Sequence, residues 1–196
     1  TYNRDFKEKH SLGITLLQSI QQDLEETLEA SVQNTPSDVL KYYDLASGLL
    51  IDGVGSDYVK WNMASFMGRI NYNYLGRYLL TVSARYDGSS RLADGHKWVL
   101  FPSAALAWRI SDESFMKSLS WVDNLKLRLG YGKTGNSSVD PYQTRGKLGK
   151  KRYVYNNGAT EIMGYAPSLM ANSTLTWETT DQWNIGLDFG FLKNRI

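Results

Sequence analysis

The sequence contains no cysteine and only two histidines and four prolines among its 196 residues. Without cysteine the chain can form neither a disulfide framework nor a thiolate metal site. His10 and His96 are far apart and have no His or Cys nearby, so we expect surface or lumen histidines and no metal site. Mean hydropathy is −0.40, and no apolar run approaches the roughly 20 residues of a membrane-spanning helix. A helical membrane protein is therefore excluded.

The sequence also has no excess of either charge. Its 22 basic and 20 acidic residues leave a net charge of +2, so no field favours nucleic acid, and we expect no nucleic-acid partner. Residues 1–5 carry no apolar signal core, and residues 191–196 predict a strand end, a tight turn and the start of another strand. We therefore expect a segment of a larger protein, with more strands on both sides.

Aromatic residues, by contrast, are abundant, with 13 Tyr and 6 Trp beside 17 Gly, a composition that favours strands and turns. Apolar and polar residues alternate with a period of two, which indicates strands with one apolar face. In residues 66–74 that face carries Phe66, Ile70 and Tyr72. The same alternation recurs in residues 11–17, 78–86, 98–110, 125–131 and 183–189.

Charged residues keep to one face of the predicted strands. The charged residues of the five longer strands all lie opposite the apolar face: Arg69, Arg85, Arg109, Lys126, Arg128 and Asp188. An Arg that faces lipid at the membrane midplane costs about 2–4 kcal/mol, so this separation is expected of a transmembrane β-barrel. A soluble β-sandwich also alternates, but only a barrel needs aromatic girdles at strand ends. Such positions hold Tyr72, Tyr74, Tyr78, Trp98, Trp108, Trp121, Tyr131 and Trp183.

The predicted connections alternate between short and long, as in barrels with tight periplasmic turns and long outer loops. Leu75-Gly76-Arg77 and residues 192–194 are short. Residues 111–124 are intermediate, and we expect a helical turn capped by Ser111 there. Long links are expected at residues 21–60, 87–97 and 133–176. Within the first of these, a short amphipathic helix is predicted at residues 22–32, from the spacing of Leu24, Leu28 and Val32.

Enzymatic motifs are missing or incomplete. Gly132-Lys133-Thr134 imitates the end of a phosphate-binding loop, but Leu127 stands where that loop needs glycine. Asp112-Glu113 is expected to be a solvated pair of helix charges. Residues 87–91, Asp-Gly-Ser-Ser-Arg, predict a tight turn or, as an alternative, a cation or sugar site. We therefore expect no enzyme and no catalytic, cofactor-binding or metal-binding residue.

Several motifs in a fixed order carry a family resemblance. The first are Gly68-Arg69-Ile70-Asn71-Tyr72-Asn73-Tyr74, Arg77-Tyr78-Leu79-Leu80-Thr81 and Arg85-Tyr86-Asp87-Gly88-Ser89-Ser90-Arg91. Further ones are Lys97-Trp98, Phe101-Pro102-Ser103, Trp108-Arg109-Ile110, Leu125-Lys126-Leu127-Arg128, Tyr131-Gly132-Lys133-Thr134-Gly135-Asn136, Trp177-Glu178-Thr179-Thr180 and Gln182-Trp183-Asn184-Ile185-Gly186-Leu187-Asp188. Together they resemble the barrel of SusC/RagA-type TonB-dependent transporters over residues 65–196, whereas residues 1–64 match more loosely.

The resemblance implies an all-β fold in which residues 1–196 form part of a single barrel domain of about 22 strands. This chain would supply six complete strands and the start of a seventh, without the plug domain. It also implies active import of an oligosaccharide or peptide across the outer membrane of a Bacteroidetes-type bacterium. The implied partners are a SusD-like surface lipoprotein, the TonB complex acting through the plug, and the lipid bilayer.

Two sets of residues are candidates for the functional surface. Lumen-lining positions are expected at Arg69, Asn71, Arg85, Lys126, Arg128, Asn184 and Asp188. Contacts of the long loops with substrate or partner are expected at Tyr142, Tyr153, Tyr155 and Tyr165. Two alternatives remain open from the sequence, a soluble β-sandwich that binds carbohydrate and a β-rich glycosidase with its acids in the long loops.

Overall fold

The computed structural model describes residues 1–119, 121–158 and 160–191. This part of the chain is all β, with nine strands, five short 3₁₀ turns and no α-helix. None of its helical turns is long and apolar enough to cross a membrane. The strands are β1 (Tyr2–Phe6), β2 (His10–Gln33), β3 (Leu50–Tyr74), β4 (Tyr78–Ser89), β5 (Trp98–Arg109), β6 (Val122–Asn136), β7 (Lys147–Tyr155), β8 (Thr160–Leu169) and β9 (Glu178–Phe191).

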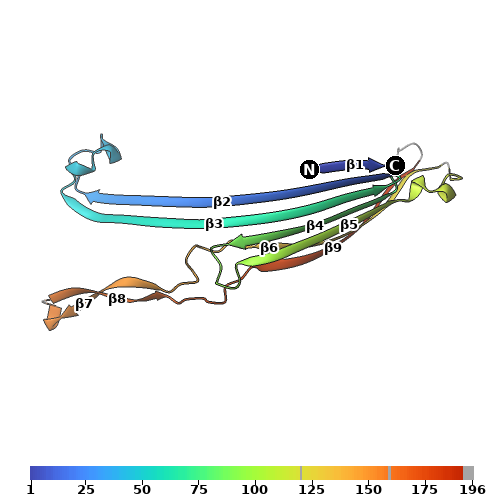
Figure 1. Ribbon diagram of the computed structural model, residues 1–196. Helices are drawn as coiled ribbons and strands as arrows, with labels where there is room; N and C mark the ends of the chain where they lie inside the picture. Colours follow the sequence, from blue (N-terminus) through green and yellow to red (C-terminus); the bar gives the residue numbers. More distant parts are fainter. Residues whose placement is uncertain (120, 159, 192–196) are drawn as a thin grey trace. The chain divides into compact units, whose positions relative to one another are not determined.

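Seven strands form one sheet in the order β1-β2-β3-β4-β5-β6-β9, and β7 pairs with β8 as a separate two-stranded sheet (Figure 1). The pairs β1–β2, β3–β4, β4–β5, β5–β6, β6–β9 and β7–β8 are antiparallel. The predicted antiparallel all-β wall is therefore confirmed. Six strands were expected in the sheet, and the seventh is β1, which the sequence pattern did not reveal. The expected turn at 192–194 and the next strand start lie outside the described residues.

Two compact units divide the chain, Thr1–Ile20 with Met63–Ile196, and Gln21–Asn62. The second unit holds residues 21–33 of β2 and 50–62 of β3, together with the 3₁₀ turns η1 (Lys41–Tyr43) and η2 (Leu45–Ser47). Within it, the Ser31 hydroxyl donates to the Asp52 carboxylate at 3.4 Å. The first unit contains the rest of the seven-stranded sheet and the β7–β8 hairpin.

The cross-strand register gives the main sheet one apolar face. Directly opposed residues of an antiparallel sheet share a face. One row of opposed residues runs through Ile70, Val82, Ala104, Tyr131 and Trp183. The neighbouring row, on the other face, runs through Asn71, Thr81, Ala105, Gly130 and Asn184. The alternation predicted from the sequence is thus confirmed for β3, β4, β5, β6 and β9.

The apolar face is exposed, which separates the two fold alternatives. Val82 is 43% exposed and Ile185 81% exposed. A β-sandwich would bury such a face against a second sheet, whereas a membrane barrel turns it to lipid. Among the described residues the buried apolar side chains are few, namely Leu92, Ala93, Phe101 and Trp177. The β-sandwich alternative is not supported by this arrangement.

The helix predicted at residues 22–32 is wrong, because β2 continues as a strand to Gln33. Leu24, Leu28 and Val32 are spaced by four residues, which is close to one helical turn but also equals two strand periods. The spacing therefore fits both structures. The expected link at 21–60 shrinks to residues 34–49, and the one at 133–176 contains the β7–β8 hairpin.

The link between β5 and β6 also differs from expectation. It contains two 3₁₀ turns, η3 (Ile110–Asp112) and η4 (Ser114–Met116), and neither has a side-chain cap. The cap expected from Ser111 is therefore wrong. The Ser111 hydroxyl points instead to the Asp112 carboxylate, at 3.4 Å.

The short turn between β3 and β4 is confirmed. Leu75 and Gly76 have φ angles of 56° and 69°, in the left-handed region that costs an L-residue about 1–2 kcal/mol. The Gly76 N–H donates to the Asn73 side-chain oxygen at 2.9 Å. Glycine thus removes the backbone strain at one of the two positions.

We expect Gly76→Ala to lower the free energy of unfolding of the full-length protein by about 1 kcal/mol, because alanine is strained at this positive φ. Gly55→Ala is the matched control, since a Cβ there meets open space and its φ is not positive. Urea unfolding in detergent micelles measures both. Equal losses in the two variants would contradict the assigned turn.

Candidate functional site

The seven predicted lumen residues all lie on the polar face of the main sheet. Lys126 is directly opposite Asp188, and Arg69 is opposite Ser83. Arg128 Nη2 lies 2.6 Å from Asp188 Oδ1, with its guanidinium beside Gly186. The positive charges of β6 are thus partly balanced by the carboxylate of β9.

Other members of the set bond to neighbouring strands. Asn71 accepts a hydrogen bond from the Thr81 hydroxyl at 3.0 Å. Arg85 Nε lies 2.7 Å from Asp87 Oδ1, and its Nη2 donates to the Ser65 hydroxyl. Since Asp87 is buried and already paired with Arg85, residues 87–91 do not present an open cation or sugar site. The segment ends β4 and begins a turn, as the simpler of the two interpretations predicted.

A shallow hollow of about 410 Å³ lies on the polar face over β4, β5, β6 and β9. Small residues form much of its lining: Ala105, Ala107, Gly130 and Gly186. Arg128 and Asn184 also line it. Their hydrogen-bond donors therefore lie beside small residues.

Aromatic rings on the apolar face form two rows. Toward the end where the short turns lie, here called the turn end, Tyr78 stacks on Tyr74 and on Trp108 at centroid distances of 6.2 and 6.3 Å. Toward the opposite end, the loop end, Trp98 stacks on Tyr86 at 4.9 Å and on Phe66 at 6.2 Å. Tyr86 follows Tyr78 by eight positions along β4, which corresponds to about 27 Å along a strand. That length fits the apolar band of about 25 Å once strand tilt shortens it.

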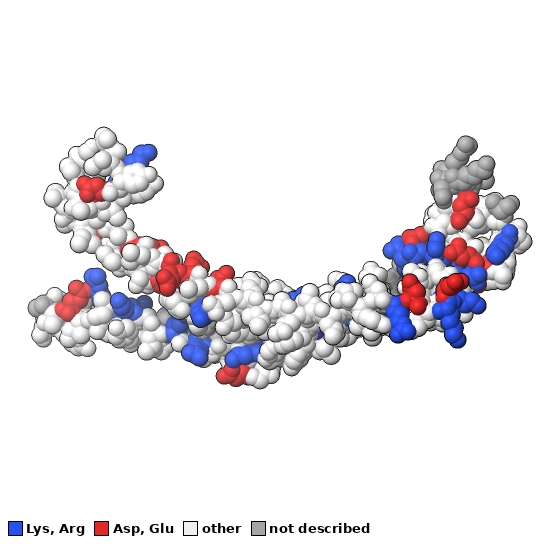
Figure 2. Space-filling model, turned by 45° about the horizontal axis from the view of Figure 1, so that its top comes forward, with Lys and Arg blue, Asp and Glu red and all other residues white. Residues whose placement is uncertain are grey.

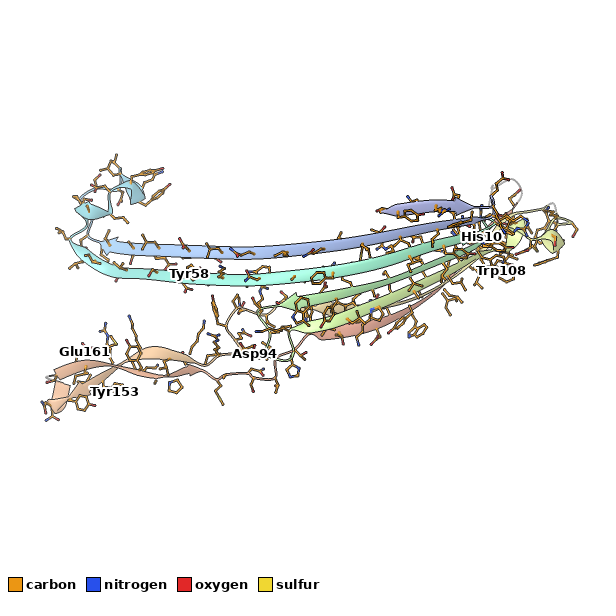
Figure 3. The ribbon with its side chains drawn as sticks, in the orientation of Figure 1. His10, Tyr58, Asp94, Trp108, Tyr153 and Glu161 are labelled. Carbon is orange, nitrogen blue, oxygen red and sulfur yellow. The ribbon has the colours of Figure 1, made fainter. Side chains whose placement is uncertain are left out.

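His10 belongs to the row at the turn end. Its Nδ1 lies 2.7 Å from the Tyr72 hydroxyl, and its ring packs 4.8 Å from that of Tyr74. Figure 3 shows His10 and Trp108 at the same end of the sheet. A surface or lumen position was expected for His10, and its contacts with Tyr72 and Tyr74 place it on the exposed apolar face. His10 is the first residue of β2 and lies opposite Phe6. At the level of the membrane interface its ring can pack on aromatic neighbours and still form a polar contact with the Tyr72 hydroxyl.

Charged side chains gather at the turn end, whereas the middle of the sheet is almost uncharged in the view of Figure 2. One buried carboxylate organises part of this end. Glu113 accepts hydrogen bonds from the Tyr78 hydroxyl at 2.6 Å, from Trp108 Nε1 at 3.1 Å and from Arg77 Nη1 at 3.2 Å. The Tyr78 and Trp108 hydrogen bonds, followed by the charge of Arg77, hold the pKa of Glu113 below its usual value.

This carboxylate ties the β5–β6 link to the aromatic row. Glu113 lies between η3 and η4, while its partners belong to β4, β5 and the β3–β4 turn. Sequence reasoning treated it as a solvated helix charge and missed this role, because its partners lie up to 36 residues away. The adjacent acid, Asp112, pairs with the exposed Arg109 at 3.4 Å.

At the loop end, an apolar cluster lies on the polar face. Phe101 and Trp177 meet edge to face at 5.3 Å, with Leu92 packed against them. Trp177 Nε1 donates to the Lys97 carbonyl at 2.8 Å, which fastens the segment before β9 to the segment before β5. Gly135 is required beside this cluster, since a Cβ there would lie 2.3 Å from the Phe101 ring.

The four predicted loop tyrosines do not share one surface. Tyr142 lies in a turn with φ of 68°, Tyr153 and Tyr155 lie on β7, and Tyr165 lies on β8. Tyr165 is opposite Lys150, whereas Tyr153 is opposite Ile162. The strand period therefore places Tyr165 on the other face of the hairpin from Tyr153 and Tyr155.

A family model described as "TonB dependent receptor-like, beta-barrel" matches residues 2–196. The chain belongs to this TonB-dependent receptor family. It is 35% identical over its full length to TonB-dependent receptor P26 of Formosa agariphila, of which it spans 20%. It is 43% identical over 141 residues to TonB-dependent receptor SusC of Bacteroides thetaiotaomicron, covering 68% of this chain and 14% of SusC.

The solved structure of the RagAB peptide transporter is also similar to this chain. It superposes with a TM-score of 0.85 and 26% identity, over 99% of this chain and 21% of the RagAB chain. The chain thus spans about a fifth or less of these relatives. The predicted resemblance to SusC/RagA-type barrels is confirmed, and with it the outer membrane as the location of this wall.

We expect the Glu113 carboxylate to stabilise the turn end in a pH-dependent way. Its pKa is lower in the folded protein than the ordinary value of 4.5, so its contribution is complete above that pH and is lost as the pH falls through the lowered folded pKa. Glu113→Gln should therefore unfold more easily than wild type at pH 7, and this difference should shrink steadily below pH 4.5. Glu161→Gln, which removes an exposed ion pair, is the control. Melting temperatures across this pH range measure the effect, and a constant difference would contradict it.

We expect Gly135→Ala to destabilise the full-length receptor by about 1–3 kcal/mol, because the added methyl group must displace a packed aromatic ring. Gly130→Ala is the matched control on the same strand, since its Cβ would meet Asn184 Cβ at an ordinary 3.7 Å. Urea unfolding in detergent distinguishes them. An unchanged free energy of unfolding for Gly135→Ala would contradict this prediction, because it would show that the Phe101 and Trp177 rings move aside at no cost.

Proposed function

We propose that this chain forms part of the wall of a TonB-dependent importer that carries a bulky nutrient, an oligosaccharide or a peptide, across the outer membrane. The observation that carries the proposal is the two-faced sheet. Its exposed apolar face lies between two aromatic rows, while its opposite face carries paired charges and the hollow lined by Arg128 and Asn184. SusC and the RagAB peptide transporter, both similar to this chain, support it.

In this proposal the polar face lines the lumen, through Arg69, Asn71, Arg85, Lys126, Arg128, Asn184 and Asp188. The ion pairs of Arg85 with Asp87 and of Arg128 with Asp188 keep this face of the wall polar. Energy would come from the TonB complex acting through a plug domain of the full-length receptor. A SusD-like surface lipoprotein would close the outer mouth of the barrel.

Neighbouring residues on opposite faces allow a sharp test. We expect cysteine at Asn71, Thr81 or Asn184 to react with a bulky membrane-impermeant maleimide in cells, and the modification to slow TonB-dependent uptake of labelled oligosaccharide or peptide severalfold. Cysteine at Ile70, Val82 or Ile185 is the matched control, one residue away on the apolar face. These positions should stay unlabelled and keep full uptake.

Two outcomes would contradict this proposal. Equal labelling at both sets of positions would refute the assignment of a lipid face and a lumen face. Uptake that is unchanged by deletion of the gene, for both oligosaccharides and peptides, would refute import of these nutrients while leaving the barrel wall intact.

A further inference from the structure

The β7–β8 hairpin has no core of its own. It is inserted between β6 and β9, and no residue of its two strands is buried. Val154 is 60% exposed and Leu148 68% exposed. An isolated two-stranded hairpin is only marginally stable in water. A cover over these side chains would therefore stabilise the hairpin.

Apolar side chains stand on both faces of this hairpin. Tyr153, Tyr155 and Ile162 occupy one face, according to the register of the two strands. Leu148, Val154, Met163 and Tyr165 occupy the other. A sugar chain stacks on aromatic rings that share one surface, and it would leave the aliphatic residues in water. Apolar groups on both faces fit a groove in a protein, which can cover both at once.

The hairpin is also basic. Its strands carry Lys147, Lys150, Lys151 and Arg152 against a single acid, Glu161, whose carboxylate lies 3.2 Å from Arg152 Nη1. Lys151 shares a face with Tyr153, whereas Lys150 and Arg152 share the other face with Tyr165. A protein groove that is complementary in charge to this hairpin would therefore carry acidic residues on both of its walls.

One aromatic residue is already held in position. The Tyr153 ring lies across Gly164 on the paired strand, where a Cβ would come 2.4 Å from the ring. Figure 3 shows Tyr153 and Glu161 near the same end of the hairpin. A ring fixed before binding loses less side-chain entropy in the complex.

We propose that the β7–β8 hairpin inserts into an acidic groove of the protein that covers the mouth of the barrel. This inference rests on the proposed function, which supplies that partner as a surface lipoprotein. The aliphatic and aromatic residues provide the buried area of the contact. The four basic side chains select an acidic groove and speed the encounter.

The test uses the full-length receptor in detergent and the lipoprotein encoded beside its gene. The variant carries Lys150→Glu, Lys151→Glu and Arg152→Glu. We expect its dissociation constant for the lipoprotein to rise at least tenfold at low salt and to depend less on salt than that of wild type. The matched control carries Lys7→Glu, Lys9→Glu and Lys117→Glu, three exposed lysines at the turn end, and should bind like wild type.

A second measurement identifies the contact directly. A zero-length carbodiimide joins lysine amines to carboxylates, and mass spectrometry should find Lys150 or Lys151 joined to Asp or Glu of the lipoprotein. Unchanged affinity of the charge-reversed receptor would overturn the inference, as would crosslinks confined to the receptor itself. Competition by a sulfated glycan at this hairpin would indicate a substrate site and would equally overturn it.

Failure of this inference can be told apart from failure of the proposed function. Wild-type receptor that imports its nutrient beside a charge-reversed variant with normal lipoprotein affinity would overturn only the docking site. Absence of uptake by the wild type would overturn the proposed import, whatever the affinity measurement gives.

Discussion

The cross-strand register of the sheet is the constraint on which both faces of the wall depend. A slip of one residue in any strand would exchange its two faces. It would turn Arg85 or Arg128 toward lipid, at a cost of about 2–4 kcal/mol for each such residue at the midplane. The polar side chains therefore enforce the register together with the apolar ones. The tight turn at Gly76 sets the pairing of β3 and β4 from the first opposed residues, Tyr74 and Tyr78.

The two ends of the sheet are fastened by opposite kinds of chemistry. At the loop end, Phe101 and Trp177 pack on the polar face, where water in the lumen gives the hydrophobic effect its usual strength. At the turn end, the β5–β6 link contacts the aromatic row that borders the lipid. Apolar side chains there gain little free energy from packing on one another, because lipid is equally apolar. A buried carboxylate, Glu113, takes the place of an apolar cluster there, and it bonds the polar edges of Tyr78 and Trp108.

The sequence predicted the faces of the strands but not the contacts beyond them. Alternation in β3 to β6 and β9 was sufficient, because every second residue is constrained by lipid. The same argument failed at residues 22–32, where a spacing of four residues is common to helix and strand. It also failed to identify the contacts of Glu113 with Tyr78, 35 residues away, and of Trp177 with Lys97, 80 residues away. Local patterns hold no information on which carboxylate or indole meets which strand end.

The composition of the apolar face also marks where the bilayer ends. On β2 this face is wholly apolar at Leu12, Ile14 and Leu16, and from Gln18 onward polar residues alternate along it with Ile20, Leu24 and Leu28. Leu16 lies 3.7 Å from the Cβ position of Gly68, so the antiparallel pairing brings Gln18 to the level of Phe66, in the aromatic row of the loop end. Polar residues thus begin on the lipid side at the level where the rings end. The strand itself continues to Gln33, because backbone pairing depends on the neighbouring strand and not on the solvent around it. Strand length and membrane thickness are therefore independent in this wall, and the aromatic row marks the boundary.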